Sequence, residues 1–195
     1  MADDQPKGRT RVAVLISGRG SNMVALVDAA AAVDCPYEVV LVAANDPDAP
    51  GLAAAQARGV ATWARSHKGL KRAEFDALVD AELRRADVAL VALAGYMRLL
   101  SPTFVDAWRG RLVNIHPSLL PAYRGLDTHA RVLAAGDARH GATVHLVTEA
   151  LDDGEIVAQA EVVVMPDDTP ETLAARVLAE EHRLYPAALA RLASR

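Results

Sequence analysis

The sequence has few cysteines and no excess of basic residues, and each absence excludes a class of protein. Its single cysteine, Cys35, cannot form a disulfide within the chain, which fits a reducing compartment. The 21 Lys and Arg are outnumbered by 25 Asp and Glu and stand singly or in pairs, so there is no basic stripe. Because nucleic-acid binding usually needs such a stripe, we expect no nucleic-acid partner.

Long apolar runs are also missing. No run approaches the roughly 20 residues of a membrane-spanning helix, and the polar N-terminus lacks the apolar region of a signal peptide. The 195 residues are nevertheless 52% hydrophobic, which is enough for a buried core. We therefore expect a cytoplasmic protein with no membrane partner, folded as one domain over residues 1–195 with a flexible tail over residues 1–9.

Short apolar segments alternate with helical patterns through the first part of the chain. Strands of the buried type are predicted at residues 11–16, 37–44, 60–63, 87–93 and 111–115. Helical periodicity lies between them, from residue 22 onward, at 52–58, at 71–85 and from residue 102. This order predicts an α/β fold with an open, mostly parallel, Rossmann-like sheet flanked by helices.

The last third of the sequence has a different pattern. After a helix at 127–135, strands are predicted at 142–148 and 156–165, with Asp152-Asp153-Gly154 in the turn between them. We expect these two strands to be antiparallel and to lie near the C-terminal edge of the sheet. A final helix should begin at Thr169, and Pro186 should kink or break it.

The unusual residues fall where the predicted parallel strands end. In such sheets, ligands bind outside the carboxyl ends of the strands. These ends carry the glycine-rich segment 17–22, Asn45-Asp46, Gly95-Tyr96-Met97 and Asn114-Ile115-His116. The sequence therefore predicts that all four share one edge and form a site there.

The segment Ser17-Gly18-Arg19-Gly20-Ser21-Asn22 joins a predicted strand to a predicted helix. Glycines and a helix N-terminus can hold an anion. Met23 replaces the third glycine of a dinucleotide fingerprint, and no Gly-Lys-Ser/Thr follows, so a monophosphate fits better than a pyrophosphate. A plain strand-to-helix turn is the alternative.

Asn114 and His116 are two positions apart in a predicted strand, so both side chains should point to the same side. An amide can donate to a developing oxyanion and a histidine can move protons near neutral pH; a structural histidine is the alternative. Asp152 by itself is an ordinary turn residue, and His145 is typical of a buried or supporting histidine. The His and Asp residues lack metal-ligand spacing, so we expect no metal.

Four strings carry a resemblance: S-G-R-G-S-N, A-G-Y-M-R-L-L-S-P, N-I-H-P-S-L-L-P-A-Y-R-G-L-D-T-H and H-G-A-T-V-H-L-V-T-E-A-L-D-D-G. Together they resemble the glycinamide ribonucleotide branch of the folate-dependent formyltransferase family, over residues 10 to 190. The resemblance implies that the formyl group of 10-formyltetrahydrofolate, the co-substrate, is transferred to the amine of 5'-phosphoribosylglycinamide in purine biosynthesis. It implies two small-molecule partners and allows a homodimer.

The resemblance also implies roles for single residues. The catalytic group is Asn114, His116 and Asp152. The residues expected to bind the acceptor substrate are Gly18, Arg19, Gly20, Ser21, Asn22 and Glu181. The residues expected to bind the folate are Met97, Arg98, Leu99, Leu100, Asn114, Val147, Thr148 and Glu149. Arg19, Asp127 and Asp153 depart from the family pattern.

Four other functions are alternatives to this one. A formylfolate hydrolase is expected to carry an additional N-terminal domain, and a formyltransferase acting on transfer RNA an additional C-terminal domain and a basic face. A nicotinamide oxidoreductase should have the third glycine that Met23 replaces. A binding module without catalysis would not need Asn114, His116 and Asp152 together.

Overall fold

Seven strands form one sheet in the order β3-β2-β1-β4-β5-β6-β7. The structure is a computed structural model that describes residues 8–195, so residues 1–7 of the predicted tail lie outside the described residues. The strands are β1 (Thr10–Ile16), β2 (Tyr37–Ala44), β3 (Thr62–Ala64), β4 (Leu90–Leu93), β5 (Leu112–His116), β6 (Arg139–Leu146) and β7 (Ile156–Val163).

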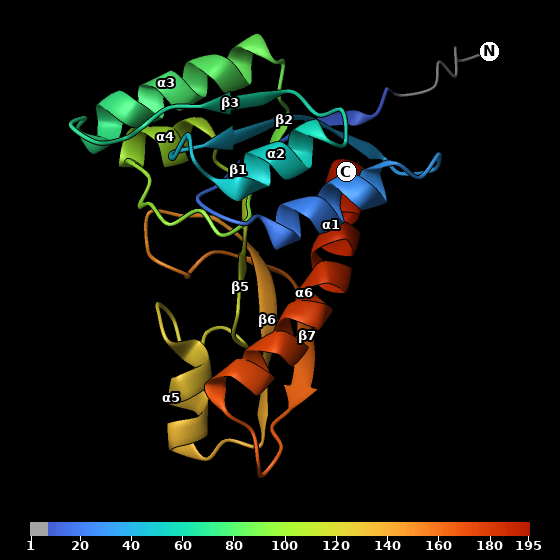
Figure 1. Ribbon diagram of the computed structural model, residues 1–195, viewed down its shortest axis with the longest axis vertical. Helices are drawn as coiled ribbons and strands as arrows, with labels where there is room; N and C mark the ends of the chain where they lie inside the picture. The colour runs from blue at the N-terminus through green and yellow to red at the C-terminus, as the bar shows by residue number, and fades with distance from the viewer. Residues whose placement is uncertain (1–7) are drawn as a thin grey trace.

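Strands β1 to β5 pair in parallel, whereas β6 is antiparallel to both β5 and β7. The predicted fold class is therefore confirmed, including the antiparallel pair at the C-terminal edge. The helices are α1 (Ser21–Ala30), α2 (Pro50–Gln56), α3 (Arg72–Arg85), α4 (Pro102–Ala107), α5 (Thr128–Ala135) and α6 (Pro170–Ala193). Figure 1 shows the long helix α6 running from the region of α5 to that of α1.

The sheet is covered on both faces, which is why its parallel strands are apolar without interruption. Alternate residues of β1 belong to two separate clusters. Val12 and Val14 pack into a cluster that includes residues of α1 and α6, whereas Ala13 and Leu15 pack into one that includes residues of α3 and α4. Both faces of β1 are thus buried, and only its ends can carry polar residues.

Helix α6 begins as the sequence predicts, because the Thr169 hydroxyl accepts the N–H of Thr172. Pro186 is predicted to kink or break this helix. A break is wrong, because α6 continues through Pro186 to Ala193. Packing explains the continuation. Tyr185 is fully buried, and its hydroxyl donates to the carbonyls of Leu93 and Val113, at 3.0 and 3.1 Å, which fastens this turn of the helix to the sheet.

Some predicted strand ends differ from those observed. Strand β4 begins at Leu90 rather than residue 87, because Asp87 has a φ of 49°, in the left-handed region that a strand cannot include. Strand β6 begins at Arg139, three residues before the predicted start, because residues 139–141 pair with β7. Among residues 8–195, no helix is both long and apolar enough to cross a bilayer.

The close approach of β6 and β7 leads to a prediction at Gly141. A Cβ added there would lie 2.0 Å from the carbonyl oxygen of Ala160, so the two strands would have to move apart. We expect Gly141→Ala to lower the free energy of unfolding by more than about 2 kcal/mol, measured by urea denaturation. Gly18→Ala is the control, because nothing lies within 4 Å of its added Cβ. Equal stability of the two variants would contradict the packing described.

Candidate active site

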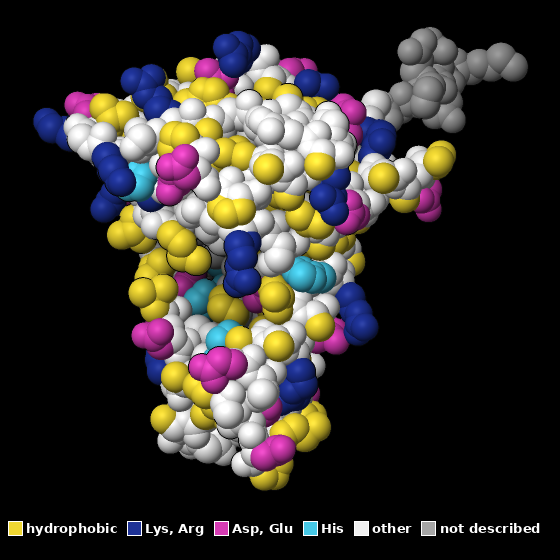
Figure 2. Space-filling model, in the orientation of Figure 1, with side chains coloured by type: hydrophobic (Ala, Val, Ile, Leu, Met, Phe, Trp, Pro, Cys, Tyr) yellow, Lys and Arg dark blue, Asp and Glu magenta, His cyan; other side chains and the backbone are white. Residues whose placement is uncertain are grey.

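Three neighbouring strands of the sheet, β1, β4 and β5, end at three of the four segments that the sequence singled out, and β2, which lies beside β1, ends at the fourth, Asn45-Asp46. The chain order reverses at β1, whose neighbours are β2 and β4, and such a reversal opens a crevice at the carboxyl ends of the strands. Figure 2 shows a hollow at the waist of the molecule, with histidine and acidic side chains at its floor. The predicted common edge is therefore confirmed.

Asn114, His116 and Asp152 come together through a fourth residue, His145. Strands β5 and β6 place Asn114 opposite His145, and the Asn114 Nδ2 lies 3.3 Å from the His145 Nε2. The Asp152 carboxylate lies between the two imidazoles, with Oδ2 at 3.4 Å from His116 Nδ1 and Oδ1 at 3.7 Å from His145 Nε2. Both histidines and Asp152 are buried, so these contacts are largely shielded from water.

The hydrogen bonds define which ring nitrogens carry hydrogen. His116 Nε2 lies 3.0 Å from the carbonyl oxygen of Tyr123. A carbonyl can only accept, so Nε2 donates and Nδ1 is left to face Asp152. A hydrogen on Nδ1 would therefore be donated to Asp152 Oδ2.

His145 has the opposite arrangement. Its Nδ1 lies 3.0 Å from the carbonyl oxygen of Leu146 and must donate to it. Burial lowers the pKa of His145, although the Leu146 carbonyl and Asp152 raise it. The ring is therefore neutral, and its Nε2 accepts a hydrogen from Asn114 Nδ2. His145 thus orients the Asn114 amide, as the buried or supporting histidine that the sequence indicates, although the sequence did not identify its partner.

Asp152 is held in place by backbone geometry. Its φ is 49°, an unusual value for a residue with a side chain, and its Oδ2 accepts the N–H of Gly125 at 2.9 Å. Two residues later, a Cβ at Gly154 would lie 1.7 Å from the carbonyl oxygen of Leu146, so only glycine lets the loop pass this close to β6. Asp153, which departs from the family pattern, forms an ion pair with Arg124 across the loop.

The glycine loop, residues 18–22, connects β1 to α1. Gly20 has a φ of 68° and is the N-cap of α1, so the backbone turns sharply there. Arg19 and Ser21 are exposed, but Asn22 is buried, and its Nδ2 donates to Glu181 Oε2 at 2.6 Å. The structure therefore joins two predicted acceptor-binding residues that lie 159 positions apart in the sequence.

Glu181 is a buried acid with a single amide partner. The residue is 6% exposed, and burial raises the pKa of its carboxyl group, whereas the hydrogen bond from Asn22 lowers it. The Oδ1 atom of Asn22 is buried and has no hydrogen-bond partner among the described residues. Polar atoms placed in this way are suited to a ligand rich in hydroxyl groups.

The donor segment, residues 97–100, follows β4. Met97 and Leu99 are 74% and 59% exposed, which is unusual for large apolar residues. The Arg98 guanidinium lies 4.8 Å from the centre of the Phe75 ring. A nearby cavity of about 260 Å³ is lined by Val105, Arg109, Val147, Thr148, Glu149 and Ala150. An apolar rim with a few polar groups is suited to a flat heterocycle.

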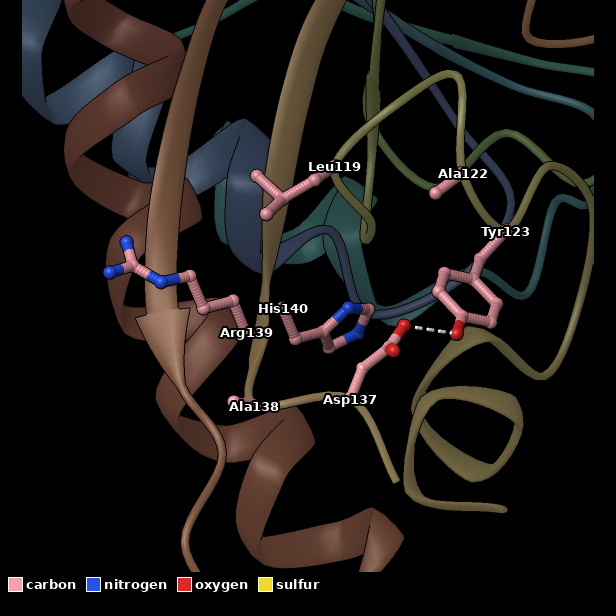
Figure 3. A pocket seen from close by; sticks show the side chains of 7 residues that line it. All are labelled: Leu119, Ala122, Tyr123, Asp137, Ala138, Arg139 and His140. Atoms are coloured by element: carbon pink, nitrogen blue, oxygen red, sulfur yellow. Dashed lines mark hydrogen bonds between the residues drawn. The ribbon is translucent and has the colours of Figure 1, made fainter. Parts of the chain in front are cut away.

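A second cavity, of about 350 Å³, is lined by residues of the loop after β5 and of the start of β6, and is shown in Figure 3. Its lining includes His140, whose Nε2 is 3.0 Å from Nδ1 of His129, and Tyr123, whose hydroxyl donates to Asp137. Among residues 8–195, no three His, Cys, Asp or Glu side chains gather closely enough to hold a metal ion.

Known proteins are similar to this chain over nearly its whole length. The formyl transferase family matches residues 10–189. The phosphoribosylglycinamide formyltransferase of Haemophilus influenzae is 41% identical over 90% of this chain and 84% of its own length. The crystal structure of phosphoribosylglycinamide formyltransferase from Brucella melitensis is similar with a TM-score of 0.92 and 50% identity, covering 96% of this chain and 97% of that one.

A longer relative is also similar. The trifunctional purine biosynthetic protein adenosine-3 of Drosophila melanogaster is 48% identical over 94% of this chain. The chain spans only 14% of that relative's length. The similarity is thus to one part of a larger protein.

The contact between His129 and the buried His140 leads to a prediction about acid stability. Burial, and then the neighbouring rings of His129 and His116, lower the pKa of His140 from 6.5 to about 4. Between these values the unfolded chain binds a proton that the folded chain does not, so the free energy of unfolding falls as the pH falls. One such group contributes up to about 1.4 kcal/mol per pH unit.

We expect His140→Gln to make this pH dependence shallower, because the variant has lost the titrating group. Urea denaturation of the wild type and the variant between pH 4 and pH 7 measures both slopes. Parallel slopes for the two proteins would contradict a neutral, buried His140.

Proposed function

Because the chain belongs to the formyl transferase family, we propose that it transfers the formyl group of 10-formyltetrahydrofolate to the amine of 5'-phosphoribosylglycinamide. The products are formylglycinamide ribonucleotide and tetrahydrofolate, and the reaction is a step of purine biosynthesis. The observation that carries the proposal is the contact of one buried carboxylate with two imidazoles, one of which orients the Asn114 amide.

The reaction begins with attack of the acceptor amine on the formyl carbonyl. A bond forms between the amine nitrogen and the formyl carbon, and the carbonyl oxygen becomes an oxyanion. Asn114 donates one Nδ2 hydrogen to His145, and the second is the donor for this oxyanion. The charge of protonated His116 stabilises the same oxygen.

The tetrahedral intermediate then breaks down. The proton leaves the acceptor amine and reaches the leaving folate nitrogen through water, and the bond between the formyl carbon and that nitrogen breaks. Asp152 supports this transfer because its carboxylate faces His116 Nδ1 and favours the charged imidazole. The net change moves one formyl group and one proton between two nitrogen atoms.

The acceptor binds along the glycine loop and α6. The phosphate is held by Gly18, Arg19, Gly20, Ser21 and Asn22, where the backbone turns into the N-terminus of α1. The ribose hydroxyls lie against Glu181, which is buried beside Asn22. A carboxylate is a strong acceptor for hydroxyl groups.

The folate binds on the opposite side of the hollow. Its heterocycle contacts the donor segment, Met97, Arg98, Leu99 and Leu100, and the start of the loop after β6, with Val147, Thr148 and Glu149. Exposed apolar side chains at this rim and the cavity beside α4 support the assignment. Asn114 lies where the two substrates meet.

Two small molecules are therefore the proposed partners, and the cytoplasm the proposed location. A net charge of −4 and the lack of a basic stripe speak against a nucleic acid. The single cysteine supports a reducing compartment.

Substitutions at the catalytic group test the mechanism. We expect Asn114→Ala to lower turnover about 100- to 1,000-fold, because an oxyanion donor is lost. His116→Ala and Asp152→Asn should each lower turnover about 100- to 10,000-fold, because proton transfer is impaired. Formation of tetrahydrofolate measures all three.

Asp153→Asn is the matched control. It changes a neighbouring carboxylate whose ion pair with Arg124 lies on the surface, so turnover should stay within about twofold of the wild type. Near-normal turnover of His116→Ala, with both substrates supplied, would refute the assignment.

The acceptor loop predicts a different kinetic signature. We expect Ser21→Ala to raise the KM for 5'-phosphoribosylglycinamide while kcat stays close to that of the wild type, because the phosphate does not change during the reaction. Initial rates over a range of acceptor concentrations separate the two constants. A loss confined to kcat would instead place Ser21 at the chemical step.

A further inference from the structure

The donor segment is fastened at its start by a residue that belongs to a different strand end. The backbone N–H of Met97 donates to the Ser17 hydroxyl at 2.8 Å, although the two residues are 80 positions apart. Ser17 directly follows β1 and directly precedes the glycine loop. One hydroxyl therefore links the segment after β4 to the loop after β1.

The Ser17 hydroxyl is itself held in one orientation. The Ser17 oxygen accepts the Met97 N–H, and the Ser17 hydroxyl hydrogen is donated to Asn45 Oδ1, at 2.6 Å. Asn45 follows β2 and is only 5% exposed, and its Nδ2 lies 3.1 Å from His67 Nδ1. A chain of hydrogen bonds thus connects the ends of three strands, β1, β2 and β4.

The other end of the donor segment has its own anchor. The N–H of Ser101 donates to Asp76 Oδ2 at 2.6 Å, and Asp76 is 1% exposed. The backbone is therefore fixed on both sides of residues 97–100, while the Met97 and Leu99 side chains point into solvent. An exposed segment without regular structure keeps one shape only if its ends are held.

The geometry points to Ser17 as a positioning residue for the folate donor, although it stands at the start of the loop that binds the acceptor. The inference rests on the proposed function and deepens it, because it concerns the same site. The Ser17 hydroxyl holds the Met97 backbone, and through it the donor segment, in the shape that receives the heterocycle. Loss of the hydroxyl should weaken binding of the folate more than binding of the acceptor.

This expectation separates positioning from a general structural role. If Ser17 had only a structural role beside the glycine loop, its substitution would lower thermal stability or weaken binding of the acceptor, whose phosphate lies on that loop. If Ser17 positions the donor segment, its substitution weakens binding of the folate alone. A hydrogen bond of this kind contributes roughly threefold to tenfold in an equilibrium constant.

The test measures the Kd of tetrahydrofolate by isothermal titration calorimetry under reducing conditions, in the absence of acceptor. Ser17→Ala and Ser17→Val should raise this Kd about threefold to tenfold. Ser17→Thr should stay within about twofold of the wild type, because Thr and Val have nearly the same shape and only Thr keeps the hydroxyl. The Kd of 5'-phosphoribosylglycinamide should change less than twofold or so in all three.

Ser21→Ala provides the contrast in the adjoining glycine loop. This substitution should raise the Kd of 5'-phosphoribosylglycinamide and leave the Kd of tetrahydrofolate as in the wild type. Hydrogen exchange at the Met97 amide supplies a readout that needs no ligand. Exchange should be faster in Ser17→Val than in Ser17→Thr, because only Val leaves the N–H without its acceptor.

Two results would overturn the inference while leaving the proposed function intact. One is equal tetrahydrofolate affinity in Ser17→Val and Ser17→Thr; the other is a loss of acceptor affinity in Ser17→Ala as large as the loss of folate affinity. Failure of the wild type to bind tetrahydrofolate would instead refute the proposed function, and the inference with it.

Discussion

The buried carboxylate of Asp152 is the constraint on which the rest of the site depends. A carboxylate removed from water is costly unless charged or hydrogen-bonding partners surround it. Here the partners come from two separate segments, His116 at the end of β5 and the N–H of Gly125, and the neutral ring of His145 on β6 lies beside the carboxylate at 3.7 Å. Holding Asp152 in place therefore requires the antiparallel edge of the sheet as well as the parallel part.

The edge strand and its loop are built to meet this requirement. Strand β6 runs against β5, so that His145 lies opposite Asn114 and can orient its amide. The loop then returns so closely over β6 that Gly154 has no room for a side chain. Asp152 itself adopts a left-handed backbone, which costs roughly 1 kcal/mol or more and is tolerated where function needs it.

Much of this arrangement could be predicted from the sequence. Parallel strands buried on both faces are continuous apolar runs, so their carboxyl ends, and the polar residues on them, were easy to locate. Strand ends such as that of β4 were misplaced because the conformation of Asp87 leaves no mark in an apolar pattern. The helix does not break at Pro186, because the packing of Tyr185 outweighs the local preference of proline.

Contacts between distant segments could not be predicted in the same way. Asp152 is an ordinary turn residue until the fold places it against His116, and only a family resemblance singled it out. The role of His145 depends on the register of β5 and β6. The pairing of Asn22 with Glu181 joins α1 to α6, and no local pattern indicates it.

A double-substitution cycle at His116 and Asp152 tests most directly whether these two residues act as one unit. The measurement is the single-turnover rate of formyl transfer in the wild type, in His116→Ala, in Asp152→Asn and in the double variant. If the pair shares one proton and one task, the double variant will be no slower than the slower single variant, within a few-fold. If the two losses multiply instead, the residues act independently, and the account of a shared proton is wrong.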